Sequence, residues 1–150
     1  MIRDDIHAAV ITAMKSGDRA ETAALRLIQS TIKNRDIEAR MQAPVTDDNA
    51  LVVEVLQKMI KQRRESIEMF EKGGRQELAD KEKAEVAVIE RFLPVQMSVA
   101  ETSAAIEAIK AELGASSVKD MGRVMTALKS RYATQLDMAK ASGLVKAALS

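Results

Sequence analysis

Residues 61–94 read KQRRESIEMFEKGGRQELADKEKAEVAVIERFLP, and this stretch decides the fold of the chain. Apolar side chains recur on both sides of the central glycine pair at steps of three and four residues, which is the period of an α-helix. The glycines end the first helix, and Pro94 ends the second. Helices joined by so short a connection pack antiparallel, so the sequence predicts a helical hairpin over residues 47–92 that ends at Phe92.

Charged residues interrupt the apolar stripe of this hairpin. Arg63 occupies one apolar-face position of the first helix, and Glu82 and Glu85 occupy two on the second. Reflection about Gly73-Gly74 places Arg63 opposite Glu85, with Glu82 as the next candidate. Paired carboxylates in a core can raise each other's pKa and do acid and base chemistry. An arginine between them keeps both ionised, so we interpret the three as a structural ion-pair network rather than a catalytic dyad.

Capping residues and glycines divide the rest of the chain into further helices. Gly17 ends a first helix that starts near Ile2, and the second helix continues to about Arg40. Side chains that can cap a helix N-terminus recur along the chain: Asp18, Thr46 with Asp47, Ser98, Ser117 with Asp120, and Asp137. No strand-like alternation is long enough to predict a sheet. The expected fold is all-α, with an N-terminal bundle of about four helices over residues 1–95 and a C-terminal three-helix lobe over residues 98–150.

The composition restricts the classes of chemistry and of location. The chain has no cysteine, which excludes disulfides and thiolate chemistry and fits a reducing compartment. No apolar run approaches the roughly 18 residues that cross a bilayer, and the first residues lack the apolar stretch of a secretory signal. We therefore expect a cytoplasmic protein without a membrane partner.

The net charge is close to zero overall but uneven along the chain. The total is +1, whereas residues 115–150 carry six basic and two acidic side chains, a net of +4. The six basic residues are Lys119, Arg123, Lys129, Arg131, Lys140 and Lys146. Such a surface can contact phosphates without reading sequence. Tyr132 is the only aromatic residue of the lobe, so structured RNA fits better than a stacked single strand. The alternative is an ordinary solvated face.

Gly122 is the most informative glycine of the lobe. It lies inside a capped helix, where glycine costs roughly 1 kcal/mol against alanine. Such a glycine indicates either close approach by another backbone or tight packing within the lobe itself. Met121 and Met125 lie four residues apart on one stripe, and we interpret them as core residues rather than as a groove for a partner.

Candidates for catalysis and metal binding are few. His7 is the only histidine, and only Asp4 shares its helix face, so we expect a partly exposed helix residue rather than a ligand. The hairpin glycines do not match a phosphate-binding loop. The sequence therefore predicts no catalytic residue, no metal site and no cofactor.

Two blocks of this sequence resemble a known family. The stretch quoted above and the later GASSVKDMGRVMTAL, residues 114–128, closely resemble the two signature blocks of the YqeY family, also called the GatB/YqeY domain family. Residues 4–40 fit that family's N-terminal helices, so the resemblance covers nearly the whole chain. Its members are similar to the C-terminal tail module of the B subunit of the glutamine-dependent aspartyl/glutamyl-tRNA amidotransferase, and a related module occurs in some glutaminyl-tRNA synthetases.

The resemblance implies a role in tRNA recognition. In those enzymes the module helps to recognise tRNA, while glutamine hydrolysis and transamidation occur in other domains. Stand-alone members are commonly labelled carbon-nitrogen ligases with glutamine as the amido donor. The positions that the resemblance assigns to tRNA contact are Lys119, Gly122, Arg123 and Lys146. Many relatives also carry a glycine-basic-Ala-Asp-Gly turn before the last helix; this chain keeps the acid as Asp137 and lacks both glycines and the basic residue.

Three functions follow as expectations. The first is a non-catalytic accessory protein that binds tRNA or another structured RNA through the C-terminal lobe. The second is a protein-protein adaptor that docks through hairpin 47–92 on an amidotransferase or aminoacyl-tRNA synthetase subunit, or on its own copy. The third is a free-standing glutamine amidotransferase, for which the chain lacks the residue patterns that such chemistry uses. The sequence leaves open the partner, the tRNA, any enzymatic activity and the oligomeric state.

Overall fold

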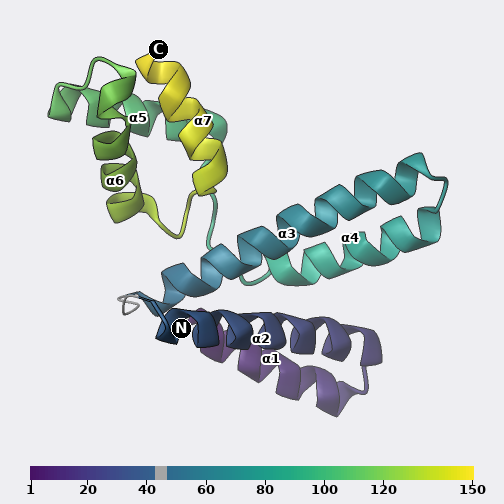
Figure 1. Ribbon diagram of the computed structural model, residues 1–150. Coiled ribbons are helices and arrows are strands. Elements are labelled where there is room, and N and C mark those ends of the chain that lie inside the picture. The colour runs from purple at the N-terminus through teal and green to yellow at the C-terminus, as the bar shows by residue number, and fades with distance from the viewer. Residues whose placement is uncertain (43–46) are drawn as a thin grey trace. The chain divides into compact units, whose positions relative to one another are not determined.

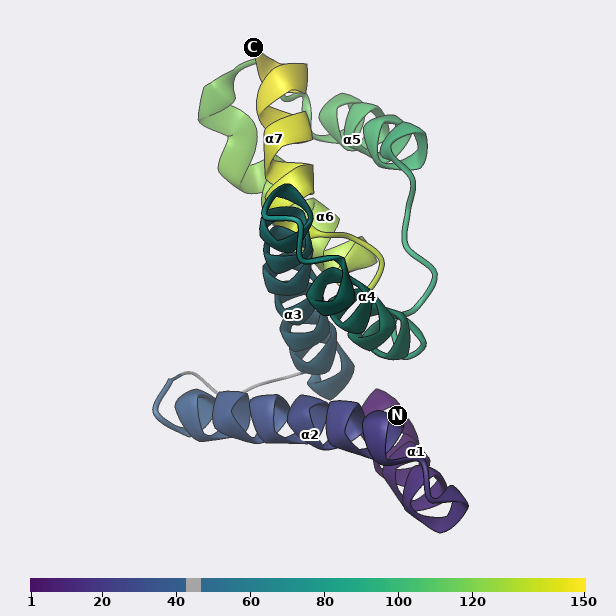
Figure 2. The ribbon, with the colours of Figure 1, turned by 90° about the vertical axis from the view of Figure 1, so that its right-hand side faces the viewer.

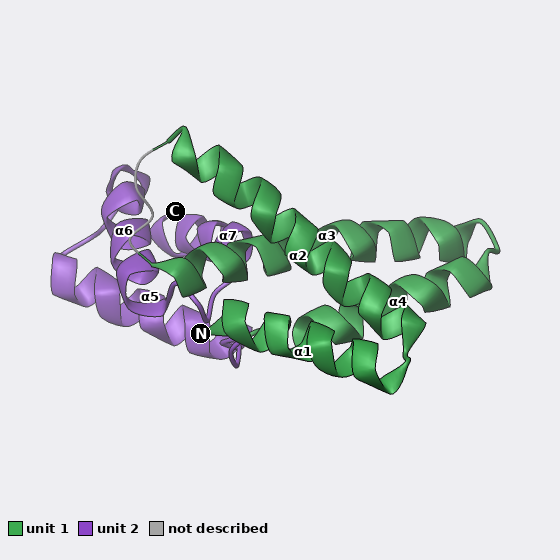
Figure 3. Cartoon of the chain, turned by 90° about the horizontal axis from the view of Figure 1, so that it is seen from below, with its two compact units in different colours: residues 1–93 green, residues 94–150 purple. Residues whose placement is uncertain are grey.

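The computed structural model describes residues 1–42 and 47–150 and is all-α over that part of the chain, as expected. Seven α-helices and one short 3₁₀ segment form in the described residues, and no strand is found among them (Figure 1). The chain divides into two compact units, Met1–Leu93 and Pro94–Ser150 (Figure 3). Thr46, which the sequence offered as part of a helix cap, lies outside the described residues.

Local residues set the ends of the helices in the first unit. These helices are α1 (Ile2–Ser16), α2 (Arg19–Arg40), α3 (Asp48–Lys72) and α4 (Gln76–Glu90). Gly17 ends α1 with a φ of 75°, in the left-handed region where glycine alone is free of strain. Asp18 and Asp47 cap α2 and α3, because their carboxylates accept the backbone N–H groups of Glu21 and Ala50.

α3 and α4 pack along each other as the expected hairpin (Figures 1 and 2). α4 ends at Glu90, however, two residues before the expected Phe92. The backbone N–H groups of Phe92 and Leu93 bond to carbonyls three residues back, which is the pattern of a 3₁₀ turn. Pro94 disfavours α geometry at Leu93, so the tighter turn ends the helix. At the other end of the hairpin, Gly74 supplies the positive φ, 71°, of the chain reversal.

One apolar core joins the four helices of the first unit. Its fully buried side chains include Ile6 of α1, Leu25 and Ile28 of α2, Leu56 of α3 and Ile89 of α4. Burying one such side chain stabilises the folded state by roughly 1.5–3 kcal/mol before the loss of conformational entropy is subtracted. The core therefore depends on one apolar stripe from every helix.

Arg3 connects three helices at the beginning of the chain. Its guanidinium donates to Asp36 of α2 at 2.8 and 2.9 Å and to Asp48 of α3 at 3.2 and 2.8 Å. The hydrogen bonds from Arg3 hold the pKa of the Asp36 carboxyl below its ordinary value. The backbone N–H of Ile2 also donates to the side chain of Asn49 at 3.1 Å. These contacts hold the start of α1 against α2 and α3.

The second unit contains α5 (Val99–Leu113), the 3₁₀ segment η1 (Val118–Asp120), α6 (Met121–Tyr132) and α7 (Met138–Leu149). Ser98 and Glu101 form the expected capping box of α5, and Gly114 ends that helix with a φ of 64°. Asp137 caps α7 by accepting two backbone N–H groups. Side-chain caps thus set the starts of α5 and α7, and a glycine sets the end of α5.

The second unit has an apolar core of its own, which shares no residue with the first. It includes Ile106 and Ile109 of α5, Val124 and Leu128 of α6 and Val145 of α7. The half-buried Met121 and Met125 pack against this core, as their spacing predicted. Each unit therefore buries its own apolar residues.

Residues 94–97 are bound to the second unit rather than forming a free linker. The side-chain amide of Gln96 donates to the carbonyl of Thr134 at 2.9 Å, and the backbone N–H of Met97 donates to the carbonyl of Gln135 at 2.9 Å. The unit therefore begins at Pro94, before the sequence-based boundary at residue 98. No local pattern reveals this boundary, because the bonds join segments that are distant along the chain.

Candidate nucleic-acid interface

Asp120 organises the turn that leads into α6. Its carboxylate accepts the backbone N–H groups of Ser116 and Ser117, at 3.0 and 3.3 Å, and a hydrogen bond from the Arg123 guanidinium at 2.7 Å. These bonds, with the one from Ser116 foremost, lower the pKa of Asp120 to about 2. The backbone N–H of Asp120 bonds to the Ser117 carbonyl three residues back, which is why the helix expected from this point opens as the 3₁₀ segment η1.

Arg123, one of the residues predicted to contact RNA, is exposed but already has partners. Besides its ion pair with Asp120, its guanidinium reaches the carbonyl of Leu113, at the end of α5, at 3.4 Å. The carboxylate compensates part of the positive charge. Arg123 therefore holds the connection between α5 and α6 and presents a partly neutralised cation at the surface.

Gly122 is exposed on the first turn of α6. A Cβ added there would meet nothing within 4 Å among the described residues outside its own helix backbone. Of the two interpretations that the sequence left open, tight packing within the lobe is excluded, and the position is open to an approaching backbone. Gly143, in the middle of α7, is open in the same way. We missed Gly143 in the sequence, although it stands three residues from both Lys140 and Lys146.

Four lysines of the lobe form no ion pair with any acidic side chain that the structure describes. They are Lys119, Lys129, Lys140 and Lys146. All four are exposed. In contrast, Arg131 pairs with Glu112 of α5 at 2.5 Å, and the hydrogen bond lowers the pKa of that carboxyl. Of the six basic residues predicted for this surface, both arginines are therefore paired, and the lysines remain available.

Lys119 and Lys146 lie on elements that meet. η1, which carries Lys119, contacts α7, whose last turns carry Lys146. Lys110 of α5 donates to the carbonyl of Ala148 at 2.8 Å, which holds the end of α7 against α5. The predicted positions Lys119, Gly122, Arg123 and Lys146 thus come together in one lobe. Within the described residues, no hydrogen bond or ion pair joins their side chains to one another.

Charge is divided unevenly between the first and the later elements of this lobe. Residues 94–114, which include α5, carry one basic and three acidic side chains, a net of −2, against +4 for residues 115–150. The basic charge is therefore concentrated on η1, α6 and α7. A polyanion is attracted to these three elements and repelled by α5.

Arg63 lies between Glu82 and Glu85 in the α3–α4 hairpin. Its Nη1 and Nη2 atoms are 3.5 Å from Glu82 Oε2 and 3.3 Å from Glu85 Oε2. The three side chains are mostly buried, with exposed fractions of 14, 24 and 23%. Arg63 Nε and Glu82 Oε2 have no hydrogen-bond partner among the described residues. Arg63 of α3 thus contacts two carboxylates of α4, so the cluster links the two helices of the hairpin as an ion-pair network.

His7 takes part in a surface contact between α1 and α2. It is exposed, and its Nδ1 lies 3.4 Å from the side-chain amide of Gln29. Over the ranges 1–42 and 47–150, no group of three or more histidine or carboxylate side chains is placed to hold a metal ion.

Comparison with known proteins adds a family and several relatives. The family model described as Yqey-like protein matches residues 3–149, which is nearly the whole chain. Several fungal relatives are named altered inheritance of mitochondria protein 41, mitochondrial. The protein of Eremothecium gossypii is 36% identical over 104 residues, covering 67% of this chain and 55% of the relative. That of Candida glabrata is 36% identical over 81 residues, covering 54% and 43%.

The third relative aligns over more of both chains. The protein of Pyrenophora tritici-repentis is 32% identical over 132 residues, which is 84% of this chain and 70% of the relative. The chain spans about half the length of the two relatives from Eremothecium and Candida.

These names correct the expected location. The relatives are mitochondrial proteins, so the cytoplasmic location expected from the sequence is wrong on this comparison. The expectation relied on the absence of cysteine and of an apolar signal segment, neither of which separates the cytoplasm from mitochondria. In the part of the chain that the structure describes, no helix is both long enough and apolar enough to cross a bilayer.

Proposed function

The chain belongs to the family of Yqey-like proteins, and we propose that it is a non-catalytic accessory protein that binds tRNA or another structured RNA through η1, α6 and α7. The observation that carries this proposal is the set of four exposed lysines without an acidic partner among the described residues. A lysine ammonium group contacts a phosphate as a point charge and needs no fixed geometry. The resemblance to the amidotransferase tail module supports tRNA as the first RNA to test.

The side chains of the lobe favour a folded RNA over a single strand. Proteins that hold single strands stack the bases on exposed aromatic rings. Tyr132, the only aromatic residue of the lobe, is half-buried and packs against the core. The open positions Gly122 and Gly143 allow a phosphate backbone to come close to α6 and α7. Recognition then depends on the spacing of phosphates, as it does for double-helical RNA.

The experiment is a titration of the full chain with unfractionated tRNA at several salt concentrations. If each of the four lysines displaces about one counterion, the logarithm of the binding constant falls with the logarithm of salt with a slope of about −3 to −4. Lys119→Gln with Lys146→Gln removes two of these contacts. We expect weaker binding and a slope that is shallower by about 2.

A matched control uses two exposed lysines of α3. Lys58→Gln with Lys61→Gln makes the same change in net charge on the first unit. The control should leave both the affinity and the salt slope unchanged. Absence of salt-sensitive tRNA binding by the unmodified protein at low ionic strength contradicts the proposal, and so does an equal loss of affinity in the control.

The adaptor function is a second proposal, and exposed apolar residues on the hairpin favour it. Met69 of α3 and Leu78 of α4 are 73% and 41% exposed. Large exposed apolar side chains mark surfaces that bind other proteins when they lie together. An interaction with a synthetase or amidotransferase subunit that persists at high salt and is lost in Met69→Ser with Leu78→Ser supports this function. An interaction that persists in this variant, or that high salt abolishes, contradicts it.

A further inference from the structure

Helix α2 has a second, exposed face with the spacing of a helix-pairing surface. Its buried face, which includes Leu25, Ile28 and Ile32, packs into the core of the first unit. Away from this face, a row of exposed residues recurs at alternating steps of three and four: Ala20, Ala23, Leu27, Ser30, Asn34, Ile37 and Met41. This 3-4 alternation is the spacing by which one helix packs along another in a coiled coil. We refer to these seven residues as the α2 seam.

The α2 seam keeps large apolar side chains in contact with solvent. Leu27, Ile37 and Met41 are 46, 48 and 87% exposed. One exposed apolar residue is ordinary, whereas these three lie on one side of α2 and its C-cap, at heptad positions of the seam. Ser30 and Asn34 occupy the middle of the seam. Polar residues at such positions weaken a helix pair and select its register, so the seam suits a reversible and specific partner.

A row of cations borders the α2 seam on one side. The row has one cation every seven residues, or about every 10.5 Å along a helix, and consists of Arg19, Arg26, Lys33 and Arg40. All four are exposed. None of them forms an ion pair with a described residue. The charge of Arg40 does help to lower the pKa of Asp36, although less than the contacts of Arg3 do. We refer to these four residues as the α2 cation row.

The acidic residues of α2 do not neutralise this row, because cations from elsewhere in the first unit hold two of them. Glu21 pairs with Arg91, which follows α4. Asp36 pairs with Arg3 of α1 at 2.8 Å. Glu38 is the remaining acid of the helix. The fold therefore pairs two of the three carboxylates of α2 with cations from outside the helix and leaves the α2 cation row exposed.

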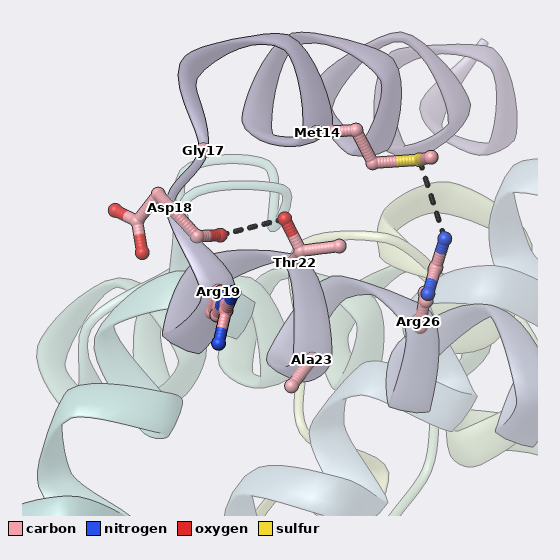
Figure 4. Close-up of a pocket in the computed structure, with 7 residues that line it drawn as sticks. All are labelled: Met14, Gly17, Asp18, Arg19, Thr22, Ala23 and Arg26. Carbon is pink, nitrogen blue, oxygen red and sulfur yellow. Dashed lines mark hydrogen bonds between the residues drawn. The ribbon is translucent and has the colours of Figure 1, made fainter.

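A surface hollow lies beside the first part of the cation row (Figure 4). Its volume is about 400 Å³, and its lining includes Met14 of α1 with Thr22 and Ala23 of α2. Arg19 and Arg26 also line it, and Arg26 reaches across to the Met14 sulfur at 3.4 Å (Figure 4). The hollow can hold an apolar side chain while the two guanidinium groups contact carboxylates next to it.

We propose that the α2 seam and the α2 cation row together dock an acidic amphipathic helix of a partner protein. The seam covers the apolar stripe of that helix, and the row pairs with glutamates or aspartates at its flanking heptad positions. This proposal does not depend on RNA binding, because it concerns the first unit and uses none of the lysines of the second.

Charge argues against a second copy of this chain as the occupant. In an antiparallel pair of α2 helices the two cation rows face each other, and like charges repel. In a parallel pair each row faces Ala24, Thr31 and Glu38, of which one is acidic. RNA is a poorer occupant as well, because the phosphate backbone leaves Leu27, Ile37 and Met41 without an apolar partner.

The test uses the full chain and two synthetic helical peptides. Both peptides carry leucine at the core heptad positions; one has glutamate on its flanks, and the other has lysine at the same places. Fluorescence anisotropy should show binding of the glutamate peptide and at least about tenfold weaker binding of the lysine peptide. Charge reversal in the row, Arg26→Glu with Lys33→Glu, should reduce the affinity about tenfold or more at low salt, and less at high salt.

Seam variants separate the apolar contribution from the charge. The double variant Leu27→Ser with Ile37→Ser should lower the affinity for the glutamate peptide by a similar factor at low and at high salt, because salt does not screen apolar burial. The matched charge control is Lys58→Glu with Lys61→Glu, on exposed positions of α3. This variant should keep the affinity of the unmodified protein for the glutamate peptide. All these positions are exposed, and circular dichroism checks that each variant keeps its helices.

Three results overturn the proposal. The first is equal binding of the two peptides. The second is a wild-type dimer in sedimentation that Leu27→Ser with Ile37→Ser converts to a monomer, which assigns the seam to a second copy. The third is loss of tRNA binding in the row variant with unchanged peptide binding, which assigns the row to RNA.

Discussion

Two neighbouring arginines of α3 form ion pairs that differ in burial, and burial is expected to decide what each pair contributes. Arg64 lies 3.0 Å from Glu90, closer than either contact of Arg63, but its pair is 58 and 47% exposed. Exposed pairs contribute about 0–1 kcal/mol, because water solvates both partners and side-chain entropy is lost. Arg63 is mostly buried between two carboxylates. Its removal leaves two acids in the hairpin without their cation.

Replacement of these arginines by methionine should therefore have unequal effects. We expect Arg63→Met to lower the free energy of unfolding by roughly 1–3 kcal/mol, below the range for fully buried pairs because some solvent reaches the acids. Arg64→Met should cost at most about 1 kcal/mol. Urea unfolding at neutral pH measures both values, and equal losses in the two variants contradict this account.

A compensated variant tests the reason for the loss. Arg63→Met combined with Glu82→Gln and Glu85→Gln removes the unpaired charges and should recover part of the stability lost in Arg63→Met. If the triple variant is no more stable than Arg63→Met, the loss comes from side-chain packing instead of charge.

At the scale of the helices, five of the six glycines fall into two groups with opposite physical roles. Gly17, Gly74 and Gly114 have positive φ, and their conformations make the turns that follow α1, α3 and α5. Gly122 and Gly143 lie inside α6 and α7 with ordinary helical geometry and open space around them. The first group is needed by the backbone, whereas nothing in the described structure requires the second.

Alanine should therefore stabilise one group and destabilise the other. Gly122→Ala and Gly143→Ala should each raise the free energy of unfolding by about 0.5–1 kcal/mol, because alanine is the better helix former. Gly17→Ala and Gly114→Ala should each lower it by about 1 kcal/mol, because a left-handed φ strains a residue with a Cβ. Thermal unfolding followed by circular dichroism ranks the four variants.

Replacement of Gly122 should change both the stability of the protein and its affinity for tRNA. If Gly122 admits an RNA backbone, Gly122→Ala should weaken tRNA binding although the protein becomes more stable. A variant with higher stability and unchanged tRNA affinity removes Gly122 from the interface and leaves the lysines to carry the binding.

At the scale of the whole molecule, the chain consists of two units with separate cores and different surfaces. The second unit concentrates uncompensated lysines on η1, α6 and α7. The first unit presents the α2 seam and the α2 cation row. The two proposed binding surfaces therefore lie on separate units and can be tested independently.

Since the units share no core residue, the second should fold alone. We expect a fragment of residues 94–150 to retain helical circular dichroism and cooperative unfolding, with modest stability because it is small. A fragment of residues 98–150 should be less stable by about 1–2 kcal/mol, because it lacks the hydrogen bonds that Gln96 and Met97 make to the 134–135 turn. An unfolded 94–150 fragment, or equal stability of the two fragments, contradicts this division.

Much of the helical architecture was readable from short-range patterns. Asp18, Ser98 and Asp137 cap helices as predicted, and Gly17 and Gly114 end them. Each of these signals acts within about four residues, so the chain carries it in consecutive positions. The meeting of Arg63 with Glu82 and Glu85 was readable too, because a short turn makes the pairing across a hairpin predictable.

The properties that decide the candidate sites were not local. Arg123 and Arg131 look like free cations in the sequence, yet Asp120 and Glu112 pair with them in the fold. Gly122 could have been packed or open, and the exposed face of α2 could have been covered. The sequence by itself determined which segments become helices and where most of them end. Only the tertiary structure decided which charges remain unpaired and which faces remain exposed, because pairing and burial depend on residues that are distant along the chain.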